Sequence, residues 1–123
     1  MKRNMELIRD CLMDIEENAK SLQYYNISFA MTQKGYDIDE CFSTLSYMEE
    51  SGLFGKTNKD LSCNFEVQGL SKLGYDFIEK IREEDIWNKT KQEINKKKLP
   101  RTIKFIAEVA GAFWGEFSKH KNS

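Results

Sequence analysis

Apolar residues recur at steps of three and four in several parts of this chain, with polar and charged residues between them. From Met5 to Asn18 they form one stripe, which predicts an amphipathic helix with a single buried face. A second helix is predicted to begin at Asp37 or Asp39, because either side chain can cap it, and to end near Ser51-Gly52. Its buried stripe is expected to contain Ile38, Cys41, Phe42, Leu45 and Met48.

Between these two helices the pattern changes to alternation. Residues 22–31 contain few helix-favouring side chains, and the apolar positions Tyr25, Ile27 and Phe29 are two residues apart. This spacing predicts a strand. Gln33-Lys34-Gly35 then provides a turn into the second helix.

A two-stranded segment is predicted after the second helix. Leu53-Phe54 is expected to begin its first strand, residues 57–60 (Thr-Asn-Lys-Asp) are typical of a turn, and Phe65 to Gln68 alternate as a half-buried return strand does. Ser71 can cap the next helix, in which Gly74 costs about 1 kcal/mol relative to alanine. We expect a close approach of the helix backbone to a strand at Gly74, which a side chain would block.

The rest of the chain is predicted to be helical. The helix that begins after Ser71 is expected to continue to the lysines of residues 96–98. Its stripe contains Tyr75, Ile78, Ile81 and Trp87. Proline suits the first turn of a helix, so Pro100 is expected to start a final helix that runs to about Lys119.

A helix, a two-stranded wing and a further helix are typical of the back half of a winged-helix domain. We therefore predict an α+β fold: a winged-helix-like domain with a small β-wing over residues 1–98, followed by an additional C-terminal helix and polar tail over residues 99–123. The core is expected to be built from Ile8, Leu12, Ile15, Phe42, Leu45, Met48, Leu53, Val67, Leu70, Phe77 and Ile81.

Composition is that of an ordinary globular domain, because 40% of the 123 residues are hydrophobic and 32% are charged. The net charge of -1 provides no general attraction to nucleic acid or anionic lipid. The N-terminal segment lacks the apolar core of a secretory signal, and no apolar run approaches the roughly 18 residues that span a bilayer. We expect a cytoplasmic protein without a membrane partner. Cys11, Cys41 and Cys63 have no CxxC spacing, so buried reduced thiols are favoured over a metal site or a disulfide.

Several segments resemble a known family. The segments MKRNMELIR, GYDID, SYMEESGLF, GLSKLGYDFIEKIRE and IWNKTK are similar to small phage and prophage proteins grouped as domain of unknown function 2513, over roughly residues 1–95. This resemblance implies a winged-helix-like fold, an origin in a bacterium or its phage, and no established activity or assigned functional residues. Many members carry a Tyr-His pair just before the position of Leu45. This chain has Ser43-Thr44 there, so any role of that histidine is absent.

DNA binding is the habitual function of winged helices, whose recognition helix needs Arg, Lys, Asn or Gln on its exposed face. The helix predicted at that place carries five carboxylates from Asp37 to Glu50 and not one Lys or Arg. Each carboxylate that faces a phosphate is repulsive in a process dominated by counterion release. Nucleic acid is therefore a disfavoured partner.

The cations lie elsewhere in the sequence. Residues 89–104 contain seven Lys and Arg residues and one acid, Glu93. They can form a phosphate-contacting patch, a surface for an acidic partner, or a solvated helix end, where cations are favourable. The candidate nucleic-acid contacts are Lys56, Lys59, Lys96, Lys97, Lys98 and Arg101.

Enzymatic chemistry finds little support in the sequence. His120 is the only histidine and lies in the polar tail, so no His-based triad or metal cluster can be built around it. There is no glycine-rich phosphate loop. Cys11 and Cys41 lie on apolar stripes, which suits packing better than nucleophilic attack. We expect no enzymatic activity, no catalytic or metal-binding residues and no cofactor.

The final helix has a wide apolar face. It can pack on the first helix and complete the core, pair with the same helix of a second copy, or lie on a membrane surface, for which it has too few lysines. The candidate homodimer face contains Ile106, Ala110, Phe113, Trp114 and Phe117.

The sequence therefore predicts a binding or regulatory protein that engages a protein partner. The candidate contact face lies on the acidic helix and contains Glu40, Tyr47, Glu49 and Glu50. The alternative is a DNA-binding regulator that uses the wing and the lysine-rich segment. One continuous basic face joining the wing to residues 96–98 would favour DNA, whereas separated cations would favour a protein partner.

Overall fold

The computed structural model describes residues 4–20 and 22–121, and the side chains of this range up to residue 119. Within these residues the chain forms helices and a small sheet, so the α+β class is confirmed. The elements in chain order are α1 (Met5–Asn18), β1 (Tyr25–Asn26), α2 (Ile27–Gln33), α3 (Ile38–Glu50), β2 (Thr57–Lys59), β3 (Phe65–Val67), α4 (Lys72–Ile81), α5 (Glu84–Lys97) and α6 (Ile103–Lys121).

The sheet is antiparallel with the strand order β1-β3-β2. β3 lies in the middle, and its Val67 is opposite Tyr25 of β1 on one side and Thr57 of β2 on the other. Phe65 and Val67 are buried and Glu66 between them is half-buried. The predicted half-buried return strand is thus confirmed.

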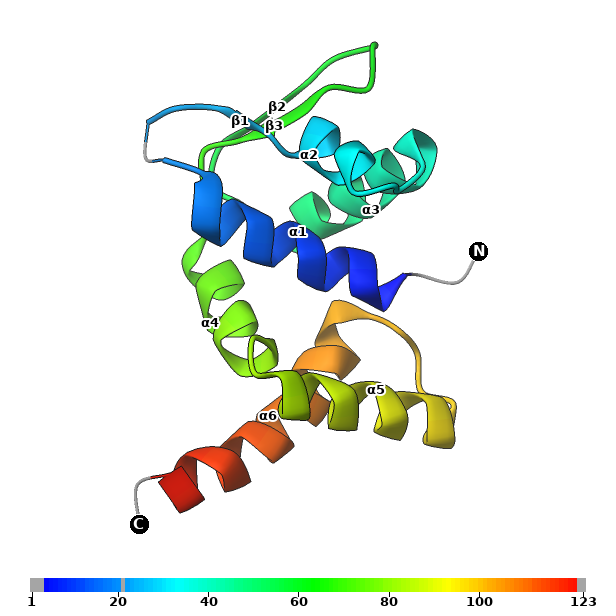
Figure 1. Cartoon of the computed structure of the whole chain (residues 1–123), viewed down its shortest axis with the longest axis vertical. Coiled ribbons are helices and arrows are strands. Elements are labelled where there is room, and N and C mark those ends of the chain that lie inside the picture. The colour runs from blue at the N-terminus through cyan, green and yellow to red at the C-terminus, as the bar shows by residue number, and fades with distance from the viewer. Residues whose placement is uncertain (1–3, 21, 122–123) are drawn as a thin grey trace.

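Helix α1 lies across the middle of the molecule (Figure 1). On one side it packs against α2 and α3, which carry the sheet above them, and on the other side against α4. Helices α5 and α6 pack against each other and form the lower side in this view. One continuous core therefore joins the N-terminal part, the sheet and the C-terminal helices.

The predicted strand over residues 22–31 is wrong, because only Tyr25 and Asn26 are extended and α2 begins directly after them. The side chain of Asn26 caps this helix by accepting a hydrogen bond from the backbone N–H of Phe29 at 3.0 Å. Ile27 and Met31, one turn apart, face the core together, whereas Phe29 is 61% exposed. Burial of the Ile27 and Met31 pair selects the helix over the alternating pattern.

The predicted turn at residues 57–60 is also wrong, because residues 57–59 form β2. The hairpin turns later, where the carboxylate of Asp60 accepts hydrogen bonds from the backbone N–H groups of Ser62 and Asn64. This local pattern, which is typical of aspartate in turns, provides acceptors for the backbone N–H groups of the loop. The residues Thr57-Asn58-Lys59 can therefore pair with β3.

The predicted start of α4 is confirmed. Ser71 caps the helix, and its side-chain oxygen accepts a hydrogen bond from the N–H of Gly74 at 3.1 Å. The predicted close approach at Gly74 is present, although its partner is the segment between α3 and β2. A Cβ atom there would overlap the carbonyl oxygen of Leu53 and lie 3.1 Å from both the Leu53 carbonyl carbon and the Leu70 Cβ.

The single helix predicted from Ser71 to residues 96–98 is interrupted between α4 and α5. The guanidinium group of Arg9 in α1 donates hydrogen bonds to the carbonyl oxygens of Ile81 at 2.9 Å and Arg82 at 2.8 Å. These carbonyls lie at the end of α4, where helix acceptors lack partners within the helix. A charged side chain from a distant element therefore provides hydrogen-bond donors for the last carbonyl groups of α4. Tyr75, which was expected in the buried stripe of this helix, is 48% exposed.

The predicted core is largely confirmed. Ten of its eleven members are buried, and the eleventh, Phe42, is half-buried and makes an edge-to-face contact with Phe65. Ile38 is 37% exposed and does not belong to the buried stripe of α3. Fully buried residues that the sequence prediction omitted include Leu7, Ile27, Met31, Trp87, Ile94 and Ile106.

Candidate functional site

Helix α3 presents its polar residues at the surface beside the β2–β3 wing. Asp37, one of the two predicted caps, caps it by accepting a hydrogen bond from the N–H of Glu40 at 3.1 Å. Asp39, Ser43 and Glu50 are exposed along the helix. The outer face of α3 is therefore polar and acidic, without a cation between residues 37 and 50.

A polar clamp fastens the end of α3 to the wing. Lys59 of β2 forms an ion pair with Glu49 at 2.8 Å, and the hydroxyl of Thr57 also donates to Glu49. The ammonium group of Lys59 lies 5.8 Å from the centre of the Phe65 ring. Lys59, a candidate nucleic-acid contact, and Glu49, a candidate protein contact, are thus partners of each other.

The clamp changes the acidity of Glu49. Burial acts to raise the pKa of this carboxyl, but hydrogen bonds from Lys59 and Thr57 and the positive charge of Lys59 outweigh it, so the pKa is below its ordinary value. A folded-state pKa that is lowered stabilises the fold above the unfolded-state pKa. This contribution disappears as the pH falls through the folded-state pKa.

We predict that Glu49→Gln lowers the free energy of unfolding by about 0.5–1 kcal/mol near neutral pH, since the pair with Lys59 is partly exposed. The difference from wild type should shrink as the pH falls below about 4.3, the ordinary Glu value. Urea denaturation at a series of pH values measures it. Glu50→Gln is the control, because Glu50 is the exposed neighbour, and a pH-dependent loss of the same size there would contradict the clamp.

Tyr47 has an internal role that the sequence analysis did not foresee. Its hydroxyl oxygen accepts a hydrogen bond from the backbone N–H of Ile103, the first residue of α6, at 2.8 Å. Glu40 likewise accepts a hydrogen bond from the side chain of Asn4 at 3.0 Å. Of the four candidate protein contacts, Glu40, Tyr47 and Glu49 therefore contribute to the fold, and Glu50 is the exposed member.

The candidate nucleic-acid contacts form two separate groups. Lys56 and Lys59 belong to the wing at the top of Figure 1, whereas residues 96–98 are at the far end of α5, in the lower part of the molecule. At that end Lys97 forms an ion pair with Glu93 at 3.1 Å, and Arg101 donates to the side chain of Asn95 at 3.0 Å. The structure does not bring the two groups together.

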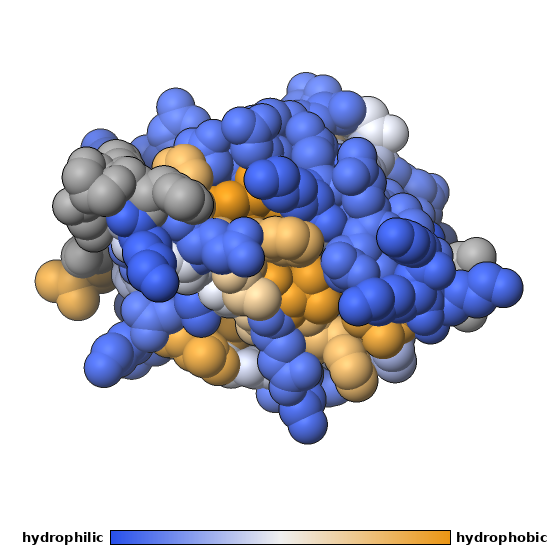
Figure 2. Space-filling view, turned by 90° about the horizontal axis from the view of Figure 1, so that it is seen from below, coloured by the Kyte–Doolittle hydropathy of each residue, from blue (hydrophilic) through white to orange (hydrophobic). Residues whose placement is uncertain are grey.

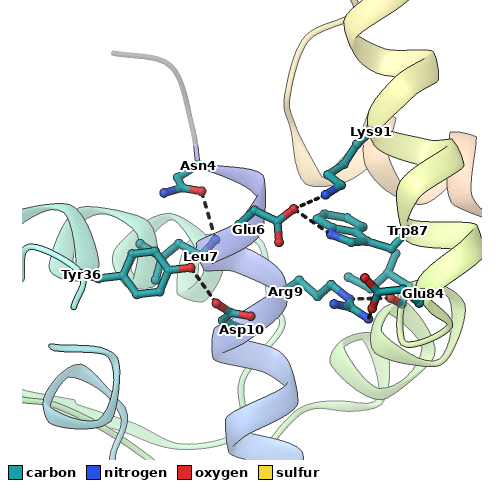
Figure 3. Close-up of polar contacts among 10 residues, drawn as sticks. Asn4, Glu6, Leu7, Arg9, Asp10, Tyr36, Glu84, Trp87 and Lys91 are labelled. Carbon is teal, nitrogen blue, oxygen red and sulfur yellow. Dashed lines mark hydrogen bonds and ion pairs between the residues drawn. The ribbon is translucent and has the colours of Figure 1, made fainter. Parts of the chain in front are cut away.

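A second polar cluster, which the sequence analysis missed, joins α1 to α5 (Figure 3). The indole N–H of Trp87 donates to Glu6 at 3.1 Å, and Lys91 pairs with the same carboxylate. Arg9 and Lys91 both lie over the Trp87 ring, at 5.7 and 5.6 Å from its centre. Arg9 stands beside the apolar stripe of α1 in sequence, and no local pattern indicates that its guanidinium is buried.

Two tyrosine hydroxyls tie α1 to the segments around α2. Tyr36 donates to Asp10 at 2.6 Å, as Figure 3 shows, and Tyr25 donates to Asp14. Burial and the hydrogen bond to Asp14 raise the pKa of Tyr25 to about 12, so it keeps its proton near neutral pH. Together with the bonds of Arg9, these contacts fasten α1 to neighbouring segments on both of its sides.

Two of the three thiols, those of Cys11 and Cys41, are buried. Burial raises the pKa of the Cys11 thiol well above its ordinary value, and burial with the charges of Glu40 and Asp37 raises that of Cys41 to about 11. Both thiols are therefore protonated near neutral pH and weakly nucleophilic. Among the described side chains, which extend to residue 119, no group of three or more His, Cys, Asp or Glu is placed to hold a metal ion. The side chain of His120 lies outside the described residues.

Similarity to known protein sequences identifies the family of this chain. The family described as "Hypothetical protein (DUF2513)" matches residues 2–100. The chain belongs to that family. A protein of Haemophilus influenzae described as "Uncharacterized protein" is 27% identical over 114 residues, which cover 89% of this chain and 92% of the relative. No solved structure gives a significant match.

Helix α6 lies beyond the residues matched by the DUF2513 family. The candidate dimer face on it needs correction, because Ile106 and Ala110 are fully buried within the protein, where α6 packs against α4 and α5. Phe113, Trp114 and Phe117 are half-buried against the same core. Self-association through α6 stays a prediction that rests on the exposed parts of these three rings.

Figure 2 shows the side of the molecule to which α5 and α6 contribute, seen from below. An apolar area lies in the middle of this face, and hydrophilic side chains border it. Within the described part of the chain, no helix is both long and apolar enough to span a membrane.

Proposed function

We propose that this DUF2513 protein is a winged-helix-like module of the bacterial or phage-infected cytoplasm, with no enzymatic activity, that binds a protein partner through the outer face of α3. The order of its N-terminal elements, α1-β1-α2-α3-β2-β3, supports the winged-helix description. The central position of β3 between β1 and β2 supports it as well. In this plan α3 takes the place of the recognition helix and β2–β3 the place of the wing.

The observation that carries the proposal is the charge of α3. A helix that enters the major groove must approach phosphates on both sides, and binding gains its free energy from cations that displace counterions. α3 instead exposes Asp39 and Glu50 and has no Lys or Arg. A protein surface, in contrast, can offer cations or hydrogen-bond donors that complement carboxylates.

The arrangement of the lysines supports the same proposal. Lys59 is paired with Glu49, so its charge is partly neutralised within the wing. The wing and the end of α5 lie far apart along the long axis of the molecule (Figure 1). Separated cations are the arrangement that we expected for a protein-binding module, and among the described residues α3 adds no cation between the two groups.

The alternative function is a DNA-binding regulator that uses the wing and the lysine-rich segment. Exposed Lys56, Lys96 and Lys98 favour it, because each can reach a phosphate. A duplex would then have to contact both ends of the molecule and avoid α3. This requirement makes the two functions distinguishable by experiment.

We predict that duplex DNA binds no more tightly than about 10⁻⁴ to 10⁻⁶ M at physiological salt, the range of non-specific binding. Fluorescence anisotropy with labelled duplexes of different sequence measures the affinity. If carboxylates of α3 repel phosphates, the double variant Asp39→Asn/Glu50→Gln should bind DNA more tightly. Asp76→Asn/Glu79→Gln on the exposed side of α4 makes the same charge change and should have a smaller effect. A sequence-selective nanomolar complex of the wild type would refute the prediction.

Site-specific cross-linking tests the partner itself. A photoreactive amino acid in place of Glu50 on α3 should capture one defined protein in the native host, and nuclease treatment should not change the yield. The same amino acid in place of exposed Glu79 on α4 is the matched control and should not capture that protein. Equal capture at both positions, or capture that disappears with nuclease, contradicts a protein-binding α3 face.

A further inference from the structure

The connection between α5 and α6 concentrates positive charge at one corner of the fold. We call this group the α5–α6 corner; its members are Lys96, Lys97, Lys98, Arg101 and Lys104. All are exposed except Arg101, which is half-buried. Within the described residues Lys97 is the member with an ion pair, to Glu93. Glu93 is the one acidic residue between positions 89 and 104.

Hydrogen bonds define the backbone that carries these cations. The N–H of Leu99 donates to the carbonyl of Ile94 at 3.0 Å, which closes the end of α5, and Arg101 is bound to Asn95. Lys98 adopts the left-handed conformation with φ 53°. Glycine is the usual residue at such a helix end because it has no Cβ to strain. The chain therefore keeps a lysine where the backbone favours glycine.

Helix electrostatics explain only part of the corner. Lys96 and Lys97 lie in the last turn of α5, where the partial negative charge of the helix end stabilises cations. Lys104 lies in the first turn of α6, which contains no acidic residue, and there the helix end is partially positive. Arg101 and Lys104 thus add positive charge beside a partially positive helix end, and neither forms an ion pair among the described residues. An external anionic group would offset this charge.

The carboxylates of α3 near the α5–α6 corner favour some anionic partners over others. The hydrogen bond from Ile103 to Tyr47 places the start of α6 against α3. On α3, Glu40 and Glu50 lie on the same side of the helix as Tyr47. A duplex or an anionic membrane presents negative charge continuously and would bring it towards these carboxylates. A polypeptide can place its acidic residues on the corner and other residues on α3.

We infer that the α5–α6 corner binds an acidic segment of the protein partner, while α3 contacts a neighbouring part of the same partner. This inference rests on the proposed function and names the chemistry of the ligand. It also assigns the two charged surfaces different roles. The corner supplies the attraction, and the polar face of α3 excludes nucleic acid.

The probe for this inference is a short polyglutamate peptide, titrated against the full-length protein by anisotropy. The variant Lys96→Glu/Lys98→Glu/Lys104→Glu should weaken peptide binding by about tenfold, since several modest ion pairs are lost together. The control Lys20→Glu/Lys56→Glu/Lys72→Glu makes the same charge change at exposed positions elsewhere, and it should weaken binding much less. Thermal unfolding of all three proteins establishes that each is folded.

Three results would overturn the inference: no saturable binding of polyglutamate, equal weakening in both triple variants, or tighter binding of duplex DNA or phosphatidylserine vesicles than of the peptide. The cross-linking experiment at Glu50 separates this failure from failure of the proposed function. If Glu50 still captures a defined protein while the peptide does not bind, only the α5–α6 corner assignment is wrong. If Glu50 captures none, the proposed function itself fails.

Discussion

Replacing Gly74 with alanine is expected to lower the free energy of unfolding by about 3 kcal/mol or more, at the upper end of what overpacking costs. The new Cβ would overlap the carbonyl oxygen of Leu53 and lie 3.1 Å from its carbonyl carbon. These atoms belong to the backbone, which cannot rotate away as the end of a flexible side chain does. The helix or the segment between α3 and β2 must therefore move.

Urea denaturation monitored by tryptophan fluorescence measures the change. Gly111→Ala is the matched control, because Gly111 also lies within a helix but a Cβ there meets nothing within 4 Å. That substitution should raise stability by about 0.5–1 kcal/mol through helix propensity. If Gly74→Ala also stabilises the protein, the close packing of α4 against Leu53 is incorrect.

Replacing Leu45 with alanine is expected to cost about 2–5 kcal/mol, the range for large-to-small changes in a well-packed core. Leu45 is completely buried in α3, in the core that α3 shares with α1 and α2. Leu73→Ala provides the control, because Leu73 is 54% exposed on α4 and should change stability by no more than about 0.5 kcal/mol. A loss of a few tenths at Leu45 would mean that the register of α3 is wrong.

The two residues bear on the proposed function because both help to hold α3 in position. Leu45 anchors the inner side of the helix, and Gly74 allows α4 to pack against the segment that follows it. The outer side is held by Glu49 at the wing and by Tyr47 at α6. The helix that carries the proposed protein-binding face is therefore anchored on several sides, and such preorganisation lowers the free-energy cost of binding.

Much of the N-terminal fold follows from local signals in the sequence. The apolar stripe of α1 and the cap at Ser71 act within one or two turns, and the sequence predicts both at their observed positions. Asp37 is one of the two caps that the sequence predicts for α3. The absence of cations from α3 was equally visible, because charge is a property of the residues themselves. These features needed no knowledge of distant partners.

The predictions that failed depend on contacts between residues far apart in the chain. Arg9 satisfies carbonyls more than seventy positions away and separates α4 from α5. Ile27 and Met31 form one face of a helix because the core lies beside them. Short apolar runs fit strand or helix equally well until a neighbouring surface selects one.

The candidate site shows the same division. Its acidic composition was determined by the sequence alone, as was the excess of lysine and arginine around the end of α5. Only the tertiary structure decided that Glu49 pairs with Lys59, that Tyr47 holds α6, and that the two basic groups lie apart. Periodicity and capping report which way a residue faces on its own element. Which residue it meets depends on how the elements pack, because side-chain partners are set by distances in space that the linear order does not contain.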